Sequence, residues 1–208
     1  FKGCANLRSV TFPRTFSNAS GPASGSIDVS EFRGCENLKY VTAANPSLKI
    51  TGGEVDTSYT FDSFKEDVPA EFYLESVDSS QFHTCATNNY MAFSYLNSDG
   101  TKQNLYELTV QETSGKKAVY RVNSSNQLVY CEFDSGLETV TMPDTVGPYQ
   151  ITVIGSGIFR NNCYLRRITI PSSITTIEDS AFKGCHNLKD VIFKEPVNVT
   201  SIGKDAFK

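Results

Sequence analysis

Apolar residues recur at fixed spacing near both ends of the chain. A phenylalanine is followed six residues later by a leucine, and the residue three positions beyond that leucine is apolar in every copy. Most copies carry a further apolar residue two positions on. Four copies begin at Phe1, Phe32, Phe159 and Phe182, and a fifth copy of the second half alone, LETVTMP, begins at Leu137. We call each copy a cassette, and this spacing indicates an internal repeat.

The residues before each phenylalanine repeat as well. An isoleucine lies five residues upstream in four places, at Ile27, Ile154, Ile177 and Ile202. In the last three places, another β-branched residue lies three positions further back. The phenylalanines at positions 159, 182 and 207 are separated by 23 and 25 residues. Such a period falls within the roughly 20–29 residues that leucine-rich repeats use.

The alternation inside a cassette predicts its local structure. In LRRITIP, Ile168 and Ile170 point to one face while Arg167 and Thr169 point to the other, which predicts a strand that the following proline ends. SSITTIEDSAF predicts a return segment with a second apolar face, and FKGC predicts a tight turn with Gly184 at positive φ. One cassette buries too little apolar surface to offset the entropy lost when it becomes ordered. We therefore predict stacked cassettes, a repeat solenoid.

The segment IPSSITTIEDSAFKGCHNLKDVIF resembles the BspA-type leucine-rich repeat family of surface and secreted proteins from bacteria and some parasites. The resemblance rests on the joint Phe-x-x-Cys-x-x-Leu and Ile-Pro-Ser-Ser-Ile-x-x-Ile elements. It covers residues 1–43 and 128–208. It implies a leucine-rich-repeat right-handed superhelix, mostly β with short helical turns.

The cassette pattern is lost between residues 45 and 127. The first part, residues 45–60, carries the Asn-Pro and Gly-Gly pairs of a loop. EFYLESV and MAFSYL predict two strands, joined by a short helix with Ser79 or Ser80 as its N-cap. We therefore expect a small α+β interruption. The expected division is the end of a first array over 1–48, an irregular loop and strand-helix-strand terminal rung over 49–115, and the start of a second array over 116–208.

The two ends of the sequence fall inside repeats. Phe1 begins within a cassette, and Lys208 directly follows the phenylalanine at position 207. Uncapped cassettes would expose apolar surface. We therefore expect this chain to be a fragment of a longer protein.

Composition narrows the possible partners. The chain has 208 residues and a formal net charge of -4. That acidic balance argues against a nucleic-acid partner, because phosphate binding needs a basic patch. No run of about 18 apolar residues occurs, so we expect no membrane span.

The cysteines and histidines are the candidate chemical groups. Cys4, Cys35 and Cys185 share one repeat phase, which Asn162 takes in another cassette, with Cys163 beside it. The spacing of about 4.8 Å between neighbouring strands permits a disulfide, but the CxxC pairs of zinc sites are absent. We favour buried free thiols bonded to turn backbone, and we expect no metal and no cofactor. His83 lies two residues before Cys85, a spacing that puts them on different faces of a helix, so we expect no enzyme.

The outward positions of the main strands are the stronger binding candidates. A solenoid would align them into one continuous face, which repeat proteins use to bind extended partners. Three basic residues in the second array favour an acidic partner. The partner-binding candidates are Arg8, Thr11, Lys39, Tyr40, Arg166, Arg167, Thr169, Lys189 and Ile192, and the same face would include Ser9, Thr42 and Asp190.

These observations predict a non-catalytic scaffold. The resemblance implies an extracellular or cell-surface protein that binds an extracellular protein or matrix partner, with adhesion as its role. The alternative is a passive spacer that holds another domain of a longer protein away from the cell. The outward residues would then be merely solvated positions with good β propensity.

Overall fold

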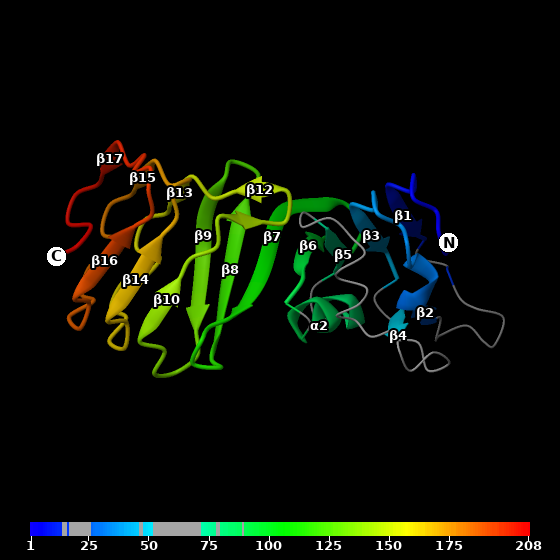
Figure 1. Ribbon diagram of the computed structural model, residues 1–208, viewed down its shortest axis with the longest axis horizontal. Helices are drawn as coiled ribbons and strands as arrows, with labels where there is room; N and C mark the ends of the chain where they lie inside the picture. The colour runs from blue at the N-terminus through cyan, green and yellow to red at the C-terminus, as the bar shows by residue number, and fades with distance from the viewer. Residues whose placement is uncertain (14–15, 17–25, 46–47, 52–71, 78–79, 89) are drawn as a thin grey trace. The chain divides into compact units, whose positions relative to one another are not determined.

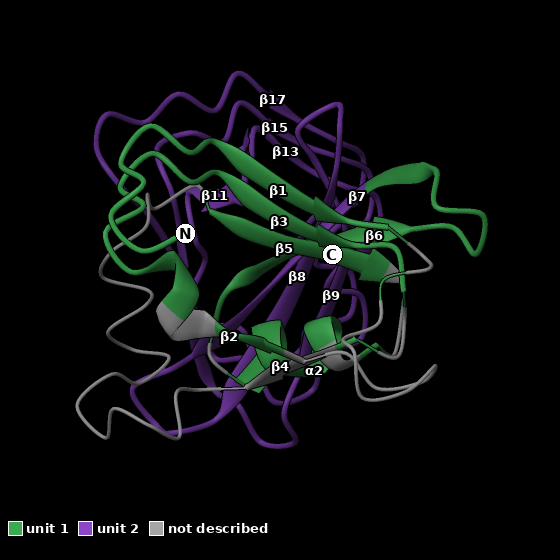
Figure 2. Cartoon of the chain, turned by 90° about the vertical axis from the view of Figure 1, so that its right-hand side faces the viewer, with its two compact units in different colours: residues 1–104 green, residues 105–208 purple. Residues whose placement is uncertain are grey.

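A computed structural model shows a mostly β chain (Figure 1), and it describes residues 1–13, 16, 26–45, 48–51, 72–77, 80–88 and 90–208. The chain divides into two compact units, unit 1 over Phe1–Asn104 and unit 2 over Leu105–Lys208, coloured separately in Figure 2. The solenoid architecture predicted from the cassettes is confirmed, because both units are built on parallel strands contributed by successive repeats. The three-part division at residues 1–48, 49–115 and 116–208 stays a prediction.

Unit 1 contains a parallel sheet made from main strands. Its strands are β1 (Ser9–Phe12), β3 (Tyr40–Ala43), β5 (Tyr73–Val77) and β6 (Ala92–Leu96). They align in register, with Ser9 opposite Tyr40, then Tyr73 and Ala92 in the following strands. A second, two-stranded parallel pair joins β2 (Ser26–Asp28) to β4 (Lys49–Thr51). The 3-10 helix η1 (Val29–Phe32) leads from β2 into the second cassette.

Strand β4 corrects the prediction that residues 45–60 form a loop. Ile50 lies opposite Ile27, so β4 continues the return segment of the preceding cassette. A sequence search for the phenylalanine spacing misses it, because the residues that follow β4 do not repeat that spacing. The rest of the predicted loop, beyond Thr51, falls outside the described residues.

The predicted strand-helix-strand piece is confirmed. Helix α2 (Gln81–Asn88) lies between β5 and β6 in the chain. The backbone N–H of His83 donates to Ser80 Oγ at 3.1 Å, so Ser80 is the N-cap that the sequence predicts. Phe82 and Ala86 point into the core of unit 1, where their side chains are fully buried.

Unit 2 begins with antiparallel strands and continues with parallel ones. Strand β7 (Lys102–Gln111) starts in unit 1 and leads into β8 (Lys117–Asn123) and β9 (Gln127–Phe133). The return strands β13 (Val153–Ile154), β15 (Thr176–Ile177) and β17 (Ser201–Ile202) then extend this sheet from β9. The main strands β10 (Thr139–Thr141), β14 (Arg167–Ile170) and β16 (Asp190–Phe193) form a separate parallel sheet. A short hairpin joins β11 (Thr145–Val146) to β12 (Tyr149–Gln150).

Columns of identical residues hold the cassettes of unit 2 together. The phenylalanine rings stack with nearly parallel planes, Phe159 on Phe182 at 4.7 Å and Phe182 on Phe207 at 5.0 Å between centroids. The side chains of Ile154 and Ile177 are fully buried beside them. The core of unit 2 therefore consists of columns of side chains stacked from one cassette to the next, and each cassette covers the apolar side of its neighbour.

Polar side chains also repeat between cassettes. The hydroxyl of Thr175 donates to the carbonyl of Thr152, and that of Thr200 donates to the carbonyl of Thr175, each at 3.2 Å. At the predicted FKGC turn, Gly184 has φ of 77°, a conformation that L side chains rarely adopt. The turn prediction is thus confirmed.

Candidate functional site

The outward positions of β10, β14 and β16 form one regular surface in unit 2, which we call the main-strand face. Thr139, Arg167 and Asp190 make one row across the three strands. Thr141, Thr169 and Ile192 make the next row. A third row, just before the strands, consists of Glu138, Arg166 and Lys189, linked by backbone hydrogen bonds of 2.8 Å. The alternate residues point inward, as the buried Val140, Ile168 and Ile170 show.

Most of this face is open to solvent. Arg166, Arg167 and Lys189 are exposed, Thr169 is half-buried, and the apolar side chain of Ile192 is 44% exposed. The structure therefore places the five predicted binding residues of the second array on one surface.

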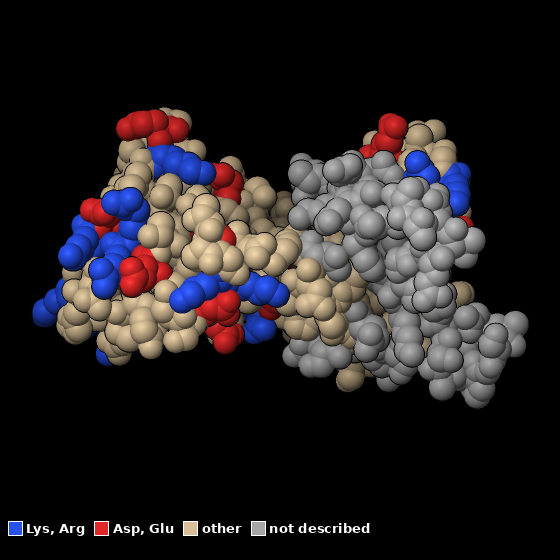
Figure 3. Space-filling model, turned by 60° about the horizontal axis from the view of Figure 1, so that its bottom comes forward, with Lys and Arg blue, Asp and Glu red and all other residues tan. Residues whose placement is uncertain are grey.

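Ion pairs neutralise part of the predicted basic cluster. Arg167 Nη2 lies 2.7 Å from Asp190 Oδ2, and Arg166 Nε lies 3.4 Å from Glu138 Oε2. The nine positions carry three basic and two acidic residues, so the face as a whole bears one positive charge. Seen from one side in Figure 3, basic and acidic side chains of unit 2 are interspersed. The surface is therefore charged but mixed in sign.

The first array carries a separate surface, so the prediction of one continuous sheet face is wrong. β1 and β3 pair with β5 in unit 1, whereas β14 and β16 pair with β10 in unit 2. Arg8, Thr11 and Lys39 are exposed on the unit 1 strands, and Tyr40 is half-buried, its ring stacked on Tyr73 at 5.3 Å.

Thr42 is buried, which corrects its predicted exposure. Its hydroxyl donates to Glu75 Oε1 at 2.9 Å, and Ser94 Oγ donates to Glu75 Oε2 at 3.1 Å. Lys102 Nζ lies 3.0 Å from the same Glu75 oxygen and 5.0 Å from the Tyr40 ring centroid. Glu75 is only 2% exposed. This polar cluster removes Thr42 from the binding candidates.

Cys35 and Cys185 have the structural role that the sequence favours. Cys185 Sγ donates to the carbonyl of Phe159 at 2.9 Å, and Cys35 Sγ donates to the carbonyl of Phe1 at 3.3 Å. Burial raises the pKa of Cys185, which keeps its thiol protonated. All six cysteines lie among the described residues, and none of them forms a disulfide. Cys4 is exposed rather than buried, because the cover over Cys35 and Cys185 comes from the preceding cassette.

The ring of His83 contacts aromatic side chains. His83 Nε2 lies 3.4 Å from the Tyr95 hydroxyl, and its ring stacks on Phe93 at 4.6 Å between centroids. His186 is exposed. Within the described parts of the chain, no three His, Cys, Asp or Glu side chains converge as a metal site.

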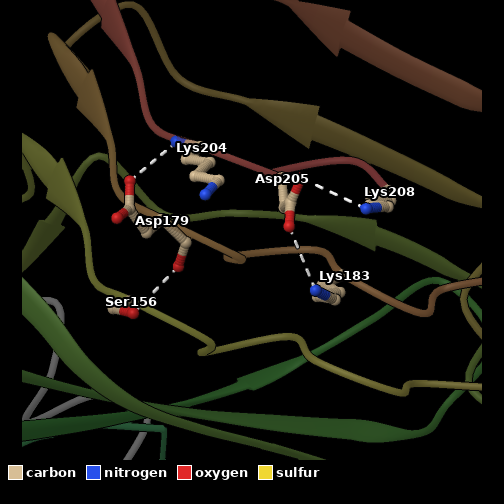
Figure 4. A network of polar contacts seen from close by, with 6 residues as sticks. All are labelled: Ser156, Asp179, Lys183, Lys204, Asp205 and Lys208. Carbon is tan, nitrogen blue, oxygen red and sulfur yellow. Dashed lines mark hydrogen bonds and ion pairs between the residues drawn. The ribbon is translucent and has the colours of Figure 1, made fainter.

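The turns before each phenylalanine carry a network of their own, shown in Figure 4. Asp179 Oδ1 accepts from the backbone N–H of Lys204 at 2.7 Å, and its carbonyl accepts from Ser156 Oγ at 2.8 Å. Lys183 Nζ lies 3.1 Å from Asp205 Oδ2, and this hydrogen bond lowers the pKa of that carboxyl. These contacts join consecutive cassettes, so we assign them to the scaffold.

One anchor of the repeat escaped the sequence analysis. Phe133 stacks on Phe159 at 5.7 Å and 23°, so it begins the cassette that contains Leu137. The separation from Phe133 to Leu137 is four residues instead of six. A search that allowed a variable turn length would have found it.

The described helices include none that is long and apolar enough to cross a membrane.

Among curated protein sequences, none matches this chain. Solved structures of several proteins are similar to parts of it. A leucine rich cell surface protein from Faecalibacterium prausnitzii A2-165 is 28% identical over 48% of this chain and 27% of its own, with a TM-score of 0.37. This chain thus spans just over a quarter of that protein.

Two further structures are similar. A leucine-rich repeat protein from Bacteroides capillosus is 27% identical over 48% of this chain and 73% of its own, with a TM-score of 0.37. The leucine rich repeat protein of T. pallidum is 18% identical over 43% of this chain and 52% of its own, with a TM-score of 0.35.

The family assignment comes from the repeats themselves. The model of the BspA type leucine rich repeat region matches residues 1–146 and 121–208, with six copies. Those two ranges cover every residue from Phe1 to Lys208. The chain therefore belongs to the BspA type leucine-rich repeat family.

Proposed function

We propose that this chain is a non-catalytic scaffold, extracellular or on a cell surface, that binds a protein or matrix partner and so serves in adhesion. The observation that supports it best is the main-strand face, where three strands in register present nine side chains on one surface. Its mixed charge and its exposed Ile192 suit a protein surface. Family membership supports a protein-binding role and an extracellular location.

The face in unit 2 is the one we assign to binding. Arg166, Arg167, Thr169, Lys189 and Ile192 all lie on it. The exposed ion pairs of the two arginines cost little to exchange for pairs with a partner, because solvated pairs contribute about 0–1 kcal/mol. Arg8, Thr11, Lys39 and Tyr40 form a second, separate candidate surface on unit 1.

The test is a binding screen by surface plasmon resonance against immobilised collagen, laminin and mucin. Wild-type chain should show saturable binding to at least one of them. The triple charge reversal Arg166→Glu, Arg167→Glu and Lys189→Glu should weaken it. The matched control reverses three exposed basic residues elsewhere in unit 2, namely Arg160, Lys204 and Lys208. Unchanged binding by the variant with Arg166, Arg167 and Lys189 reversed would reject the main-strand face as the binding surface. Lack of binding to collagen, laminin and mucin alike would favour the alternative, a passive spacer.

A further inference from the structure

The turn of the cassette that begins at Phe133 is two residues shorter than the turn of the next cassette. The separation from phenylalanine to leucine is four residues in this cassette and six from Phe159 to Leu165. The leucines nevertheless occupy the same place, because Leu137 and Leu165 are both fully buried. The missing residues are therefore missing from the turn alone.

The short turn bonds to the hairpin of β7 and β8. Asp134 Oδ2 accepts from the backbone N–H of Lys117 at 2.7 Å, and the Ser135 carbonyl accepts from Lys116 Nζ at 2.7 Å. In the cassettes that begin at Phe1 and Phe159, the corresponding turn carbonyl accepts from an asparagine of the next cassette, as that of Ala5 accepts from Asn37 Nδ2 at 2.7 Å. The usual bond between consecutive turns is thus replaced here.

The following turn departs from the repeat at the matching positions. Asn162 stands where other cassettes have the buried cysteine, and its Oδ1 accepts from the backbone N–H groups of Tyr164 and Leu165 at 3.0 and 2.9 Å. Tyr164 stands where Asn37 and Asn187 donate to the preceding turn, and its side chain is 49% exposed. In the described chain, no hydrogen bond joins the side chain of Asn162 or Tyr164 to the cassette before it.

A surface pocket of about 320 Å³, open to solvent, lies between the two turns, and we call it the cavity. Its lining residues are Phe133, Asp134, Ser135, Leu137, Asn161, Asn162, Cys163 and Tyr164. The lining thus combines the aromatic side chains of Phe133 and Tyr164, of which Tyr164 is 49% exposed, with the polar side chains of Asn161 and Asn162. This volume lies at the lower end of the roughly 300–1,000 Å³ of ligand pockets.

We propose that this cavity is an anchor site for a partner polypeptide, which inserts one apolar side chain between the two turns. In the next pair of cassettes, the turn that begins at Phe159 is two residues longer, and its Cys163 carbonyl accepts from Asn187 Nδ2. The cavity lies beside the turn that lacks those two residues, so a polypeptide segment is the occupant that the repeat itself suggests. The cavity adjoins the main-strand face, because Leu137 and Leu165 directly precede Glu138 and Arg166. The proposal therefore rests on the proposed function and adds an anchoring contact beside the charged surface.

Cys163 makes a direct test possible, because it is an exposed free thiol in the cavity wall. The probes are disulfides of cysteamine acylated with N-acetyl-phenylalanine, N-acetyl-leucine or N-acetyl-glycine, and a disulfide of thioglucose. Each is equilibrated with the chain in the presence of β-mercaptoethanol, and labelled cysteines are identified by peptide mass spectrometry. Cys4, which is exposed but lies outside the cavity, serves as the internal reference.

The phenylalanyl and leucyl probes should hold Cys163 against about fivefold more reductant than the glycyl probe, the ratio that roughly 1 kcal/mol of added burial produces. Cys4 should show no such preference. Tyr164→Ala should abolish the preference, whereas the matched variant Tyr130→Ala, which alters an exposed tyrosine outside the cavity, should preserve it. Equal retention of all probes, the same ranking at Cys4, persistence in Tyr164→Ala, or preference for thioglucose would each overturn the proposal.

The outcomes for the cavity and for the proposed function are separable. Preference at Cys163 without binding to any matrix protein would keep the anchor site and reject the proposed function. Binding to a matrix protein without preference at Cys163 would reject the anchor site alone.

Discussion

The stacked phenylalanines allow a quantitative test of the solenoid. Phe182 is 1% exposed and lies between two parallel rings, Phe159 at 4.7 Å and Phe207 at 5.0 Å. Replacing a buried phenylalanine with alanine costs about 3–5 kcal/mol. Of that, each stacked ring pair contributes roughly 0.5–1.5 kcal/mol beyond the burial of area. We therefore expect Phe182→Ala to lower the free energy of unfolding by about 3–5 kcal/mol.

Phe207→Ala is the matched control, because this ring has the same chemistry but one stacking partner and 43% exposure. It should cost about 0.8–1.5 kcal/mol, roughly half of the ~1.5–3 kcal/mol that full burial of the ring contributes. The measurement is urea unfolding followed by circular dichroism, with an unchanged dependence on urea concentration as the check that both variants unfold alike. Equal losses in the two variants, or a larger loss for Phe207→Ala, would refute in-register stacking.

Three further predictions concern single contacts. Gly203→Ala should lower the melting temperature of the chain strongly, because the added Cβ would lie 2.4 Å from the backbone nitrogen of Asp179; an unchanged melting temperature would contradict the close approach of β15 and β17. Burial raises the pKa of Glu112, although a hydrogen bond from Thr141 lowers it, so its ionised form is disfavoured in the folded chain. The stability that this carboxyl contributes is fully present below a pH of about 4.3, its pKa in the unfolded chain, and is lost as the pH rises through its folded-state pKa. The difference in melting temperature between wild type and Glu112→Gln should therefore change between pH 4 and 8. A difference that stays constant over this range would contradict the prediction. Lys102→Met should cost about 1–3 kcal/mol in urea unfolding, because it leaves the charge of Glu75 buried without a cation, whereas Lys102→Arg should restore most of it.

The cassettes were predictable because each repeats the same local pattern. The alternation in residues 165–171 identified β14, and the glycine of FKGC identified a turn at positive φ. Each of these features is set by neighbours within a few residues. Repetition then multiplies the signal, since four copies with the same spacing cannot arise from the propensity of one segment.

The buried face of unit 1 was not predictable from the same pattern. Alternation places Thr42 and Glu75 on the outward side of their strands, where side chains normally meet solvent. Their burial depends on Ser94 and on Lys102, which lie 19 and 27 residues beyond Glu75 in the sequence. No local rule reveals that a buried carboxylate will find two hydroxyls and an ammonium group at such distances.

The lining of the cavity was visible in the sequence but was not interpretable there. Asn162 stood out as a departure from the cysteine of the repeat, whereas Tyr164 was not singled out. What they face depends on the cassette before them, and Phe133 was concealed by a spacing of four residues. The fold could thus be predicted from what repeats, whereas the candidate site needed coordinates for the part that does not.

The same repeat position can therefore serve either the scaffold or a ligand, according to the turn that precedes it. The side-chain amide of Asn37 donates a hydrogen bond to the preceding turn, so replacing Asn37 weakens the stack and removes no binding surface. At the equivalent position Tyr164 has no such bond, because the shortened turn is held by Lys116 and Lys117. One cassette thus uses this position to hold the stack together, whereas the other leaves it exposed. We therefore propose that, in this chain, the shortened turn at Phe133 marks the place where the side chain at position 164 is available to a partner instead of holding the stack.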